Sequence, residues 1–398
     1  MAKRKSKAKK TAEKISKNKY YVTFIVIMFV IIVIAAYFYR KNYGNLGTPE
    51  SGTERESVGT TVVEGDSVKD LTVTFIDVGQ GDAILIELPD GKNMLVDAGD
   101  KPAENKTQLD KALRDKNGNK KKLDYVVATH PDSDHIYQMP YIYENYEVGK
   151  SFRPYVKSGY SKAGELGDDF NLGVDIGNST ATYYNYLKAV KDEGTPWEFF
   201  YDGSDFGGRI VVGETTYEYT VDFMMPYAKE LTDYVKDNPN NYSAVFMLRY
   251  AGRNLLFTGD IGKQSTAKTD VERVFAKYYE GNADADCDVL KVAHHGSESS
   301  TCVEFLNVVK PEYSVISCGL KNKHKHPTKE ALDRLIAANS KIYRTDLQGN
   351  VVLTVNAKGE MKFTVDTTAN DEYIFCDYYK IVDLIAEGKI LKNGSRKT

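Results

Sequence analysis

The chain has 398 residues, of which 41% are hydrophobic and 27% charged, a composition that is ordinary for a globular protein with a sizeable core. Its length allows one large domain or two of average size. The four cysteines lack CxxC spacing and indicate neither a zinc ribbon nor a disulfide scaffold. Residues 1–19 carry nine basic side chains and one acidic side chain. The remaining 44 basic and 55 acidic residues give a net charge near −11, which argues against a broad basic surface for nucleic-acid backbones.

A membrane anchor is predicted near the N-terminus. Residues 20–39 contain no charge, and twenty such residues are enough for a helix to span a bilayer. The basic tail, residues 1–19, outweighs Arg40 and Lys41, so we expect one pass through the cell membrane, a cytoplasmic N-terminus and an extracellular domain. A cleaved signal peptide is the alternative, but the apolar run is long and no small-x-small cleavage site follows it. Residues 40–69, rich in Gly, Thr, Ser and Glu, are expected to form a flexible linker.

The apolar runs that follow predict short strands that alternate with helices. Residues 136–225, rich in Tyr, Gly and Asp, are expected to be a variable insertion, and residues 367–398 a C-terminal extension with the pattern of one more amphipathic helix. The alternation predicts a layered α/β domain over residues 70–366. The predicted strands are 71–79, 83–88, 93–99, 123–130, 242–250, 255–260, 288–296 and 313–319, and the predicted helices are 266–281, 304–309 and 327–339.

Histidine and aspartate gather at the ends of these predicted strands. The stretch THPDSDH, residues 129–135, follows directly after an apolar run and contains two histidines and two aspartates within six consecutive residues. Imidazole and carboxylate suit Zn²⁺ or Mn²⁺, and the whole set exceeds one tetrahedral site, so two divalent ions sharing a carboxylate are expected. The candidate metal ligands are His130, Asp132, Asp134, His135, Asp260, His294, His295 and His326.

Each of these clusters also has a purely structural interpretation. THPDSDH alone could be a solvated turn with a capping aspartate, and FTGD, residues 257–260, is typical of a strand that ends in a turn. HHGS, residues 294–297, could be a simple loop, and HKHP, residues 324–327, an approach to a helix. Their joint occurrence, each beside a predicted strand end, favours the metal site.

The motifs together resemble a known family. THPDSDH, LLFTGD and VLKVAHHGS resemble the metallo-β-lactamase superfamily, whose members fold as a four-layer αββα sandwich. FIDVGQGDAILIE, LVDAG, NNYSAVFML and HPTKEAL resemble a narrower branch, the extracytoplasmic hydrolase domain of the competence DNA-uptake protein ComEC and its stand-alone relatives. One departure stands out: Ile136-Tyr137-Gln138 follows the histidine motif where relatives have Ile-Gly-Gly.

The resemblance implies a role for each motif. His130 and Asp132 would bind one metal, Asp134 and His135 the other, and Asp260 would bridge both, so that Asp134 and Asp260 are the candidate catalytic residues. One of His294 and His295, together with His326, would complete the two sites. The second shell is expected to contain Asp77, Gln80, Asp82 and Asp97. Weaker predictions place Asn241 and Ser243 against the substrate.

The function implied is a membrane-anchored two-metal phosphodiesterase or nuclease acting on DNA. A water activated by the metals, rather than Ser133 or a cysteine, is the expected nucleophile. An esterase acting on a cell-envelope phosphodiester, such as phosphorylcholine on teichoic acid, is a second enzymatic interpretation. A tethered binding protein that keeps a vestigial site is the non-enzymatic one. The sequence indicates no protein partner.

Overall fold

The computed structural model describes residues 58–65, 67–101, 103–175, 180–200, 205–224, 238–263, 270–367 and 371–390. The chain divides into two units, Met1–Arg55 and Glu56–Thr398, and every described residue lies in the second. The predicted basic tail and the predicted membrane helix therefore lie outside the described residues. Within the described ranges, no helix combines the length and apolarity needed to cross a membrane.

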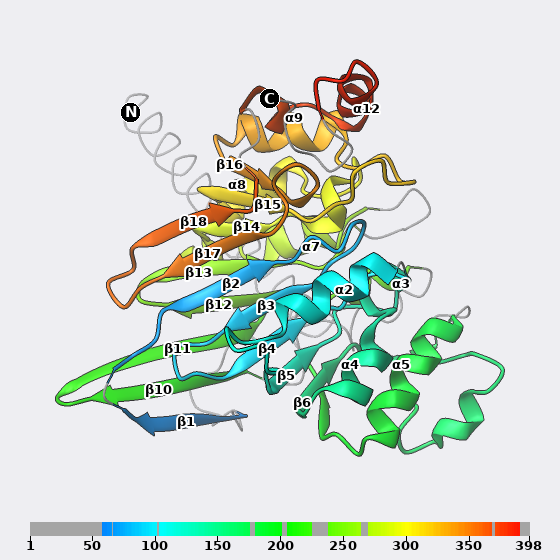
Figure 1. Cartoon of the computed structure of the whole chain (residues 1–398), viewed down its shortest axis with the longest axis vertical. Coiled ribbons are helices and arrows are strands. Elements are labelled where there is room, and N and C mark those ends of the chain that lie inside the picture. The colour runs from blue at the N-terminus through cyan, green and yellow to red at the C-terminus, as the bar shows by residue number, and fades with distance from the viewer. Residues whose placement is uncertain are drawn as a thin grey trace, which may run out of the picture. The chain divides into compact units, whose positions relative to one another are not determined.

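The first of two large sheets contains the predicted N-terminal strands (Figure 1). Its order is β18-β17-β2-β3-β4-β5-β6-β9, and the strands from β4 to β9 run parallel. Its strands are β2 (Leu71–Phe75), β3 (Ile84–Glu87), β4 (Asn93–Val96), β5 (Leu123–Val127), β6 (Val148–Arg153), β9 (Trp197–Phe199), β17 (Val351–Val355) and β18 (Met361–Val365).

The second sheet has the order β1-β10-β11-β12-β13-β14-β15-β16, with parallel pairing from β13 to β16. Its strands are β1 (Val58–Glu64), β10 (Phe206–Val212), β11 (Thr215–Phe223), β12 (Phe246–Tyr250), β13 (Arg253–Phe257), β14 (Val289–Lys291), β15 (Tyr313–Ile316) and β16 (Lys341–Arg344). A small separate ladder joins β7 (Val156–Lys157) to β8 (Val174–Asp175).

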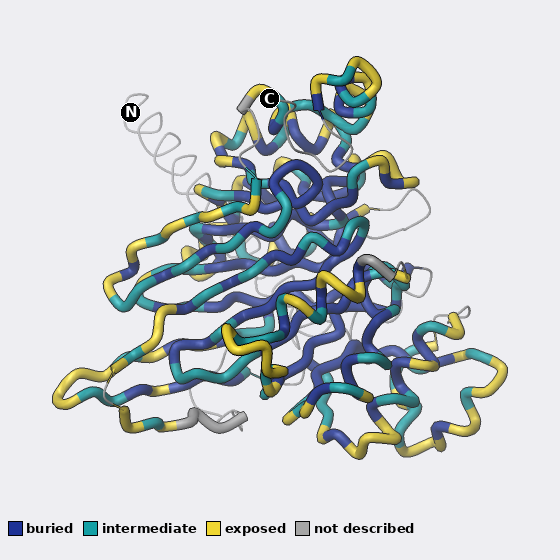
Figure 2. Tube along the Cα trace, viewed as in Figure 1, coloured by how far each residue is buried: buried dark blue, intermediate teal, exposed yellow. Residues whose placement is uncertain are grey.

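The two sheets pack face to face around one apolar core. Alternate residues of β2, beginning with Leu71, are buried, as the period of two in a half-covered strand requires. Aromatic rings join the sheets: Phe257 of the second sheet stacks on Phe75 of the first, with ring centroids 6.3 Å apart, and on its own neighbour Phe246 at 4.6 Å. Figure 2 shows the strands as the most deeply buried part of the fold. This inner core holds the two sheets together, and with them the loops at the ends of their strands.

Helices cover the other faces of both sheets and bury a second apolar cluster. Leu95 of the first sheet shares this cluster with Leu109 of α2, and Leu290 of the second sheet shares it with Phe305 of α8. The helices are α2 (Ala103–Ala112), α3 (Ser133–Ile136), α4 (Met139–Asn145), α5 (Ala181–Asp192), α7 (Val271–Tyr278), α8 (Val303–Val309), α9 (Lys329–Ala337), α10 (Thr345–Gln348), α11 (Asp371–Ile374) and α12 (Tyr378–Ala386). The result is the layered α/β architecture that the sequence predicts.

Three segments differ from the sequence prediction. Part of the predicted linker forms β1, which pairs in parallel with β10, because the β-branched run TTVV suits an edge strand. The predicted insertion, residues 136–225, supplies β6, β9, β10 and β11 to the two sheets, so it is part of the framework rather than an appendage. The C-terminal extension contributes two short helices, and Ile381 and Leu384 of α12 are buried in the helical core.

Candidate metal centre

The candidate ligands meet where the carboxyl ends of parallel strands lie together. THPDSDH follows β5, Asp260 follows β13, and His294 and His295 follow β14. A glycine lets the loop between β2 and β3 lie against the backbone of Asp134. Gly81 has φ +125°, and a Cβ there would lie 2.0 Å from the carbonyl oxygen of Asp134. This contact explains why a glycine stands between Gln80 and Asp82 in the loop after β2.

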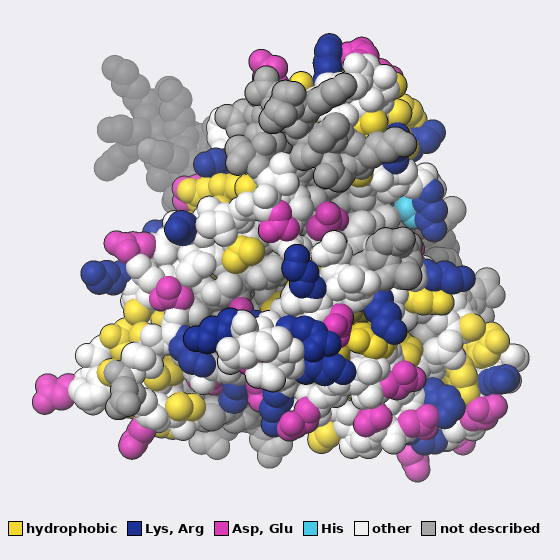
Figure 3. All heavy atoms as spheres, in the orientation of Figure 1, with side chains coloured by type: hydrophobic (Ala, Val, Ile, Leu, Met, Phe, Trp, Pro, Cys, Tyr) yellow, Lys and Arg dark blue, Asp and Glu magenta, His cyan; other side chains and the backbone are white. Residues whose placement is uncertain are grey.

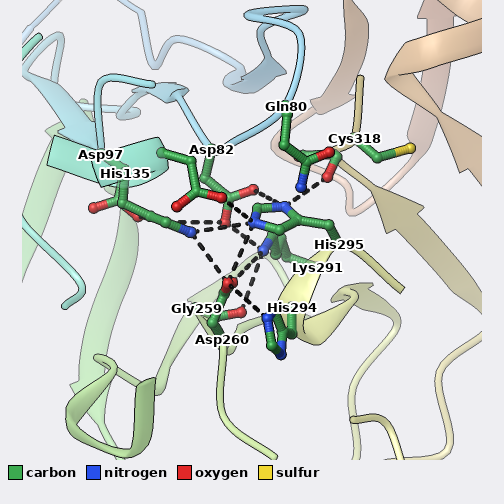
Figure 4. A network of polar contacts seen from close by, with 12 residues as sticks. Gln80, Asp82, Asp97, His135, Gly259, Asp260, Lys291, His294, His295 and Cys318 are labelled. Carbon is green, nitrogen blue, oxygen red and sulfur yellow. Dashed lines mark hydrogen bonds and ion pairs between the residues drawn. The ribbon is translucent and has the colours of Figure 1, made fainter. Parts of the chain in front are cut away.

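Three imidazoles converge on one carboxylate oxygen (Figure 4). The Nε2 atoms of His135 and His295 each lie 3.2 Å from Oδ2 of Asp260, and they lie 3.2 Å from each other. The Nε2 atom of His294 lies 3.9 Å from the same oxygen, and Oδ2 of Asp134 lies 3.5 Å from His295. His135, His295 and Asp260 are buried. Two donors bound to one tetrahedral ion at about 2.0–2.1 Å would lie ~3.3 Å apart, which matches this spacing.

The opposite ring nitrogens are held by hydrogen bonds that set the orientation of the rings. His295 donates Nδ1–H to the carbonyl of Ser317 over 2.8 Å, which directs Nε2 toward Asp260. His135 Nδ1 lies 2.7 Å from Oδ2 of Asp97, and that carboxylate also accepts the amide of Thr129. Such outer contacts fix the tautomer and direction of ligating histidines. Asp97, a predicted second-shell residue, contacts the ring nitrogen of His135 that points away from Asp260.

The charge of the cluster is balanced internally. Burial raises the pKa of Asp260, but the three neighbouring histidines outweigh burial and hold it well below its ordinary value. Burial alone would lower the pKa of His135, yet Asp260 and Asp97 raise it well above the usual range. The carboxylates and imidazoles of the cluster thus shift each other's pKa values in opposite directions, as close groups of opposite charge do.

Several buried polar atoms of the cluster have no hydrogen-bond partner in the part of the chain that the structure describes. A buried polar atom without a partner is costly, and bound divalent ions are one way in which proteins satisfy such imidazole and carboxylate atoms. The donors are imidazole nitrogens and a carboxylate oxygen, which fit Zn²⁺ or Mn²⁺. These atoms are Nε2 of His130, Oδ1 of Asp260, Nδ1 of His294 and Nδ1 of His326.

Lys291 is the site residue that the sequence prediction missed. Its buried ammonium contacts the carboxylate of Asp82 and donates to the carbonyl of Gly259 over 3.2 Å. Burial lowers the pKa of Lys291, but Asp82 and Asp260 outweigh burial and raise it. A lysine inside the apolar strand VLKVA was the available signal, because lysine is almost never fully buried without a partner.

Asp82 is close enough to act as a ligand but is already paired. Its oxygens belong to a group with His135, Asp260 and His295 in which the four potential ligand atoms lie within 4.8 Å of one another. The contact with Lys291 neutralises this carboxylate, and Asp82 Oδ2 is still 3.7 Å from His135 Nδ1. Asp82, which the sequence predicts to lie in the second shell, is thus close enough to be a ligand but paired with Lys291.

His130, Asp132 and His326 flank this group. Oδ2 of Asp132, on a partly exposed side chain, lies 3.9 Å from Nε2 of the buried His130. The ring centroid of His326 is 5.5 Å from that of His294 and 6.5 Å from that of His295. The structure thus brings all eight predicted metal ligands together beside the ends of strands from both sheets, and both members of the adjacent histidine pair are among them.

The remaining predicted residues divide into two kinds. Asp77 accepts the amide of Gly79 within its own loop, so this contact serves the turn rather than a metal ligand. Ser243 accepts the amide of Asp260 over 2.9 Å, a contact that positions the candidate bridging carboxylate. Gln80 lies beside His295 in Figure 4, and its buried Nε2 has no partner among the described residues. The side-chain nitrogen and oxygen of buried Asn241 also have no hydrogen-bond partner among the described residues. Gln80 and Asn241 can therefore still form hydrogen bonds with a ligand.

The departure from the Ile-Gly-Gly pattern closes a turn beside the site. Gln138 donates Nε2–H to the carbonyl of Asp100 over 3.0 Å, and the ammonium of Lys101 lies 5.9 Å from the ring centroid of Tyr137. Both side chains are thus engaged with the loop after β4. Glycine has no side chain and could make neither contact, so a Gly-Gly sequence at these positions would not hold the loop after β4 in this way.

Comparisons with known proteins show what the chain is similar to. Residues 76–223 match the model of the Metallo-beta-lactamase superfamily, a match that runs through the region expected to be an unmatched insertion. The chain is 28% identical over 277 residues to competence protein ComA of Neisseria gonorrhoeae and 26% identical over 298 residues to ComE operon protein 3 of Bacillus subtilis (strain 168). These matches cover 70% of this chain but only 31% and 32% of the relatives, so the chain spans about a third of their length.

Among solved structures, the metallo-β-lactamase fold protein YhfI of Bacillus subtilis matches 72% of this chain and 100% of its own, with a TM-score of 0.39 and 12% identity. The fold implies binding of a divalent metal, and the Asp and His group described above supplies suitable ligands. Residues 76–223 thus carry a domain of the metallo-β-lactamase superfamily, and competence proteins are among the proteins to which the chain is similar.

Proposed function

We propose that the chain is a metal-dependent hydrolase that cleaves phosphodiester bonds in DNA. The observation that carries the proposal is the convergence of His135, His294 and His295 on one buried oxygen of Asp260. A buried set of nitrogen and oxygen donors with unsatisfied atoms is suited to divalent ions, which are the usual catalysts of phosphodiester hydrolysis.

We assign the candidate ligands to two groups that share Asp260. One contains Asp134, His135 and His295, whose ring nitrogens and carboxylate oxygen lie within 3.5 Å of a neighbour in the group. The other contains His130, Asp132 and His294, with His326 beside it. In this proposal both adjacent histidines are ligands, one for each ion, so the choice between them that the sequence left open disappears.

The metals would lower the pKa of a water molecule and neutralise the charge that develops on phosphate. The chain's own residues would hold the ligands and the substrate. Lys291 and Asp97 would keep Asp82 and His135 in place, and the unpartnered amides of Gln80 and Asn241 would donate to phosphate oxygens. Ser133 is not needed as a nucleophile, because its neighbours are assigned to the metals and none can serve as its base.

DNA is proposed as the substrate because the relatives are competence proteins and because a third match, 32% identical over 112 residues, is recombination protein 2 of Haemophilus influenzae. Basic and acidic side chains are interspersed over the face seen in Figure 3. Binding should therefore depend on the metal centre more than on a broad basic surface.

A substrate panel tests this proposal. Metal-loaded protein should hydrolyse single-stranded DNA and a chromogenic phosphodiester, and it should leave phosphorylcholine on teichoic acid intact. Release of phosphorylcholine without cleavage of DNA would favour an envelope esterase instead. Binding of DNA without hydrolysis of any ester would favour a tethered binding protein.

We also propose that residues 20–39 anchor the chain in the cell membrane with the N-terminus inside. The support is the uncharged run of twenty residues and the nine basic residues before it. A protease added to intact cells should then digest the domain and leave the N-terminal tail protected. A domain that resists the protease until the cells are lysed would refute this topology.

A further inference from the structure

The C-terminal extension contacts the loop that carries His326. The backbone N–H of Tyr378, the first residue of α12, donates to the carbonyl of Pro327 over 3.1 Å. The ammonium of Lys325 lies 5.3 Å from the ring centroid of Tyr379. Residues on both sides of His326 are therefore held by α12, although His326 itself faces the other histidines.

A buried arginine fastens the extension to the second sheet. Arg344, at the end of β16, donates Nη1–H to the carbonyls of Ile374 and Cys376 over 3.1 and 2.5 Å. The same guanidinium pairs with Asp346 over 2.7 Å and is fully buried. Because β16 is part of the framework, Arg344 fixes the connection between α11 and α12, and with it the first residue of α12.

Pro327 is the point where this contact reaches the candidate metal centre. A Cβ on Gly296 would lie 2.7 Å from Cβ of Pro327, so the loop after His295 packs directly on this proline. The next residue, Thr328, donates its amide to the carbonyl of Gly296 over 2.9 Å. A displacement of Pro327 would therefore move His326 relative to His294 and His295.

The other support of His326 comes from within its own loop. Asn322 accepts the amide of His326 over 3.0 Å and donates to its carbonyl over 2.6 Å. These bonds shape the loop, but they do not join it to another part of the fold. The contact from Tyr378 does so, and it leaves the candidate ligand atoms untouched.

We propose that residues 371–390 act as a clamp that positions His326, with the Tyr378 amide and Arg344 as its positioning groups. This inference rests on the proposed role of His326 as a metal ligand. The extension, for which the sequence indicated no role, would then be part of the support of the metal centre, in the way that outer contacts tune metal affinity elsewhere.

One substitution isolates the clamp. Tyr378→Pro removes the N–H donor, and proline is tolerated at the first position of a helix, so α12 should persist. Asp377 before it is extended, with φ −68° and ψ 173°, as a residue before proline must be. Tyr378→Ala is the matched control because it removes the side chain and keeps the donor. The measurement is Zn²⁺ affinity of the full-length chain against a competing chelator, with melting temperature as the test of folding.

We expect Tyr378→Pro to weaken the affinity for one ion about tenfold, which is a typical effect of removing a group that supports a metal ligand. Tyr378→Ala should leave the affinity unchanged. His326→Ala is the reference and should weaken the same ion. Unchanged affinity in Tyr378→Pro beside a loss in His326→Ala would overturn the clamp. No loss in His326→Ala would instead contradict the proposed ligand, and equal losses in both Tyr378 variants would attribute the effect to the side chain.

A measurement on the unaltered chain keeps the inference testable if Tyr378→Pro fails to fold. Coupling between sites is reciprocal, so an ion that needs the clamp must also stabilise it. Hydrogen exchange of the amides in residues 371–390 should slow when Zn²⁺ is added to metal-free protein. Exchange that is the same with and without Zn²⁺, while the ligand loops become protected, would overturn the proposal.

Discussion

Asp260 is the residue on which the proposed site depends most. One oxygen of its buried carboxylate lies 3.2 Å from His135 and from His295 and 3.9 Å from His294. Its backbone is in turn fixed by the hydroxyl of Ser243. The position of a carboxylate between two groups of ligands is what a bridge between two ions requires.

Replacing this residue should therefore affect both ions. We expect Asp260→Ala to lose both metals, and Asp132→Ala, whose side chain is partly exposed at the edge of one group, to lose mainly one. Elemental analysis of metal per protein after dialysis measures the difference. Loss of the same single ion in both variants would show that Asp260 does not bridge.

Lys291 supports the site through charge, and its removal should cost stability. Lys291→Met would leave the buried carboxylate of Asp82 without its partner, and breaking a buried ion pair in this way costs about 3–5 kcal/mol of unfolding free energy. Adding Asp82→Asn should recover a large part of that loss, since the stranded charge is gone. Urea unfolding of the two single variants and the double variant measures this. Strictly additive losses would mean that the two residues do not interact.

Much of the site could be predicted from sequence because His and Asp followed apolar strands in recognisable motifs. The pairing of Asp82 with Lys291 could not, because it joins residues more than two hundred positions apart through the contact of two sheets. The role of Ser243 was predicted differently, since only the pairing of β12 with β13 brings its hydroxyl to the amide of Asp260. The adjacent histidines were also ambiguous in sequence, since only the fold shows both at the strand edge.

At the level of elements, the helices of the second sheet are held by a buried carboxylate. Glu272 of α7 accepts the amides of Thr301 and Cys302 over 2.5 and 2.7 Å at the start of α8. Burial outweighs these two donors and raises the pKa of Glu272 from 4.5 to about 7. A group of this kind stabilises the fold when protonated.

The sign of the pH dependence follows from the two pKa values. The stabilisation is complete below pH 4.5 and is lost as the pH rises to about 7, because the folded state keeps a proton that the unfolded state has released. Glu272→Gln removes this titration, so the difference in unfolding free energy between the two proteins should change by up to about 3 kcal/mol over that interval. Urea unfolding at several pH values measures it, and parallel stability curves would contradict the assignment.

The elements show where local pattern suffices and where it fails. α9 begins at its predicted place because Thr328 caps it and accepts the amide of Ala331, a signal readable in PTKEAL. β1 was missed because residues 40–69 are polar overall, and only pairing with β10 gives its short β-branched run a partner. The strands within residues 136–225 were missed for a similar reason, since β9 to β11 are defined by their neighbours in the two sheets.

At the scale of the whole chain, an acidic protein is proposed to act on a polyanion. The net charge of −3 includes the basic tail, so the part beyond residue 19 is more acidic still. Phosphate contacts from lysine and arginine normally make DNA binding steeply salt-dependent. Binding centred on metal ions should show a weaker dependence on salt and a strong dependence on the metal.

The central claim is that hydrolysis of phosphodiesters requires the metal centre, and titration of metal against activity tests it most directly. Full-length protein is stripped with a chelator, returned to Zn²⁺ or Mn²⁺ in steps, and assayed on single-stranded DNA while the bound metal is counted. We predict no cleavage by the stripped protein, full recovery as the second equivalent of one of these ions binds, and none at any level in Asp260→Ala. Cleavage that persists in the stripped protein, or in Asp260→Ala, would contradict the account.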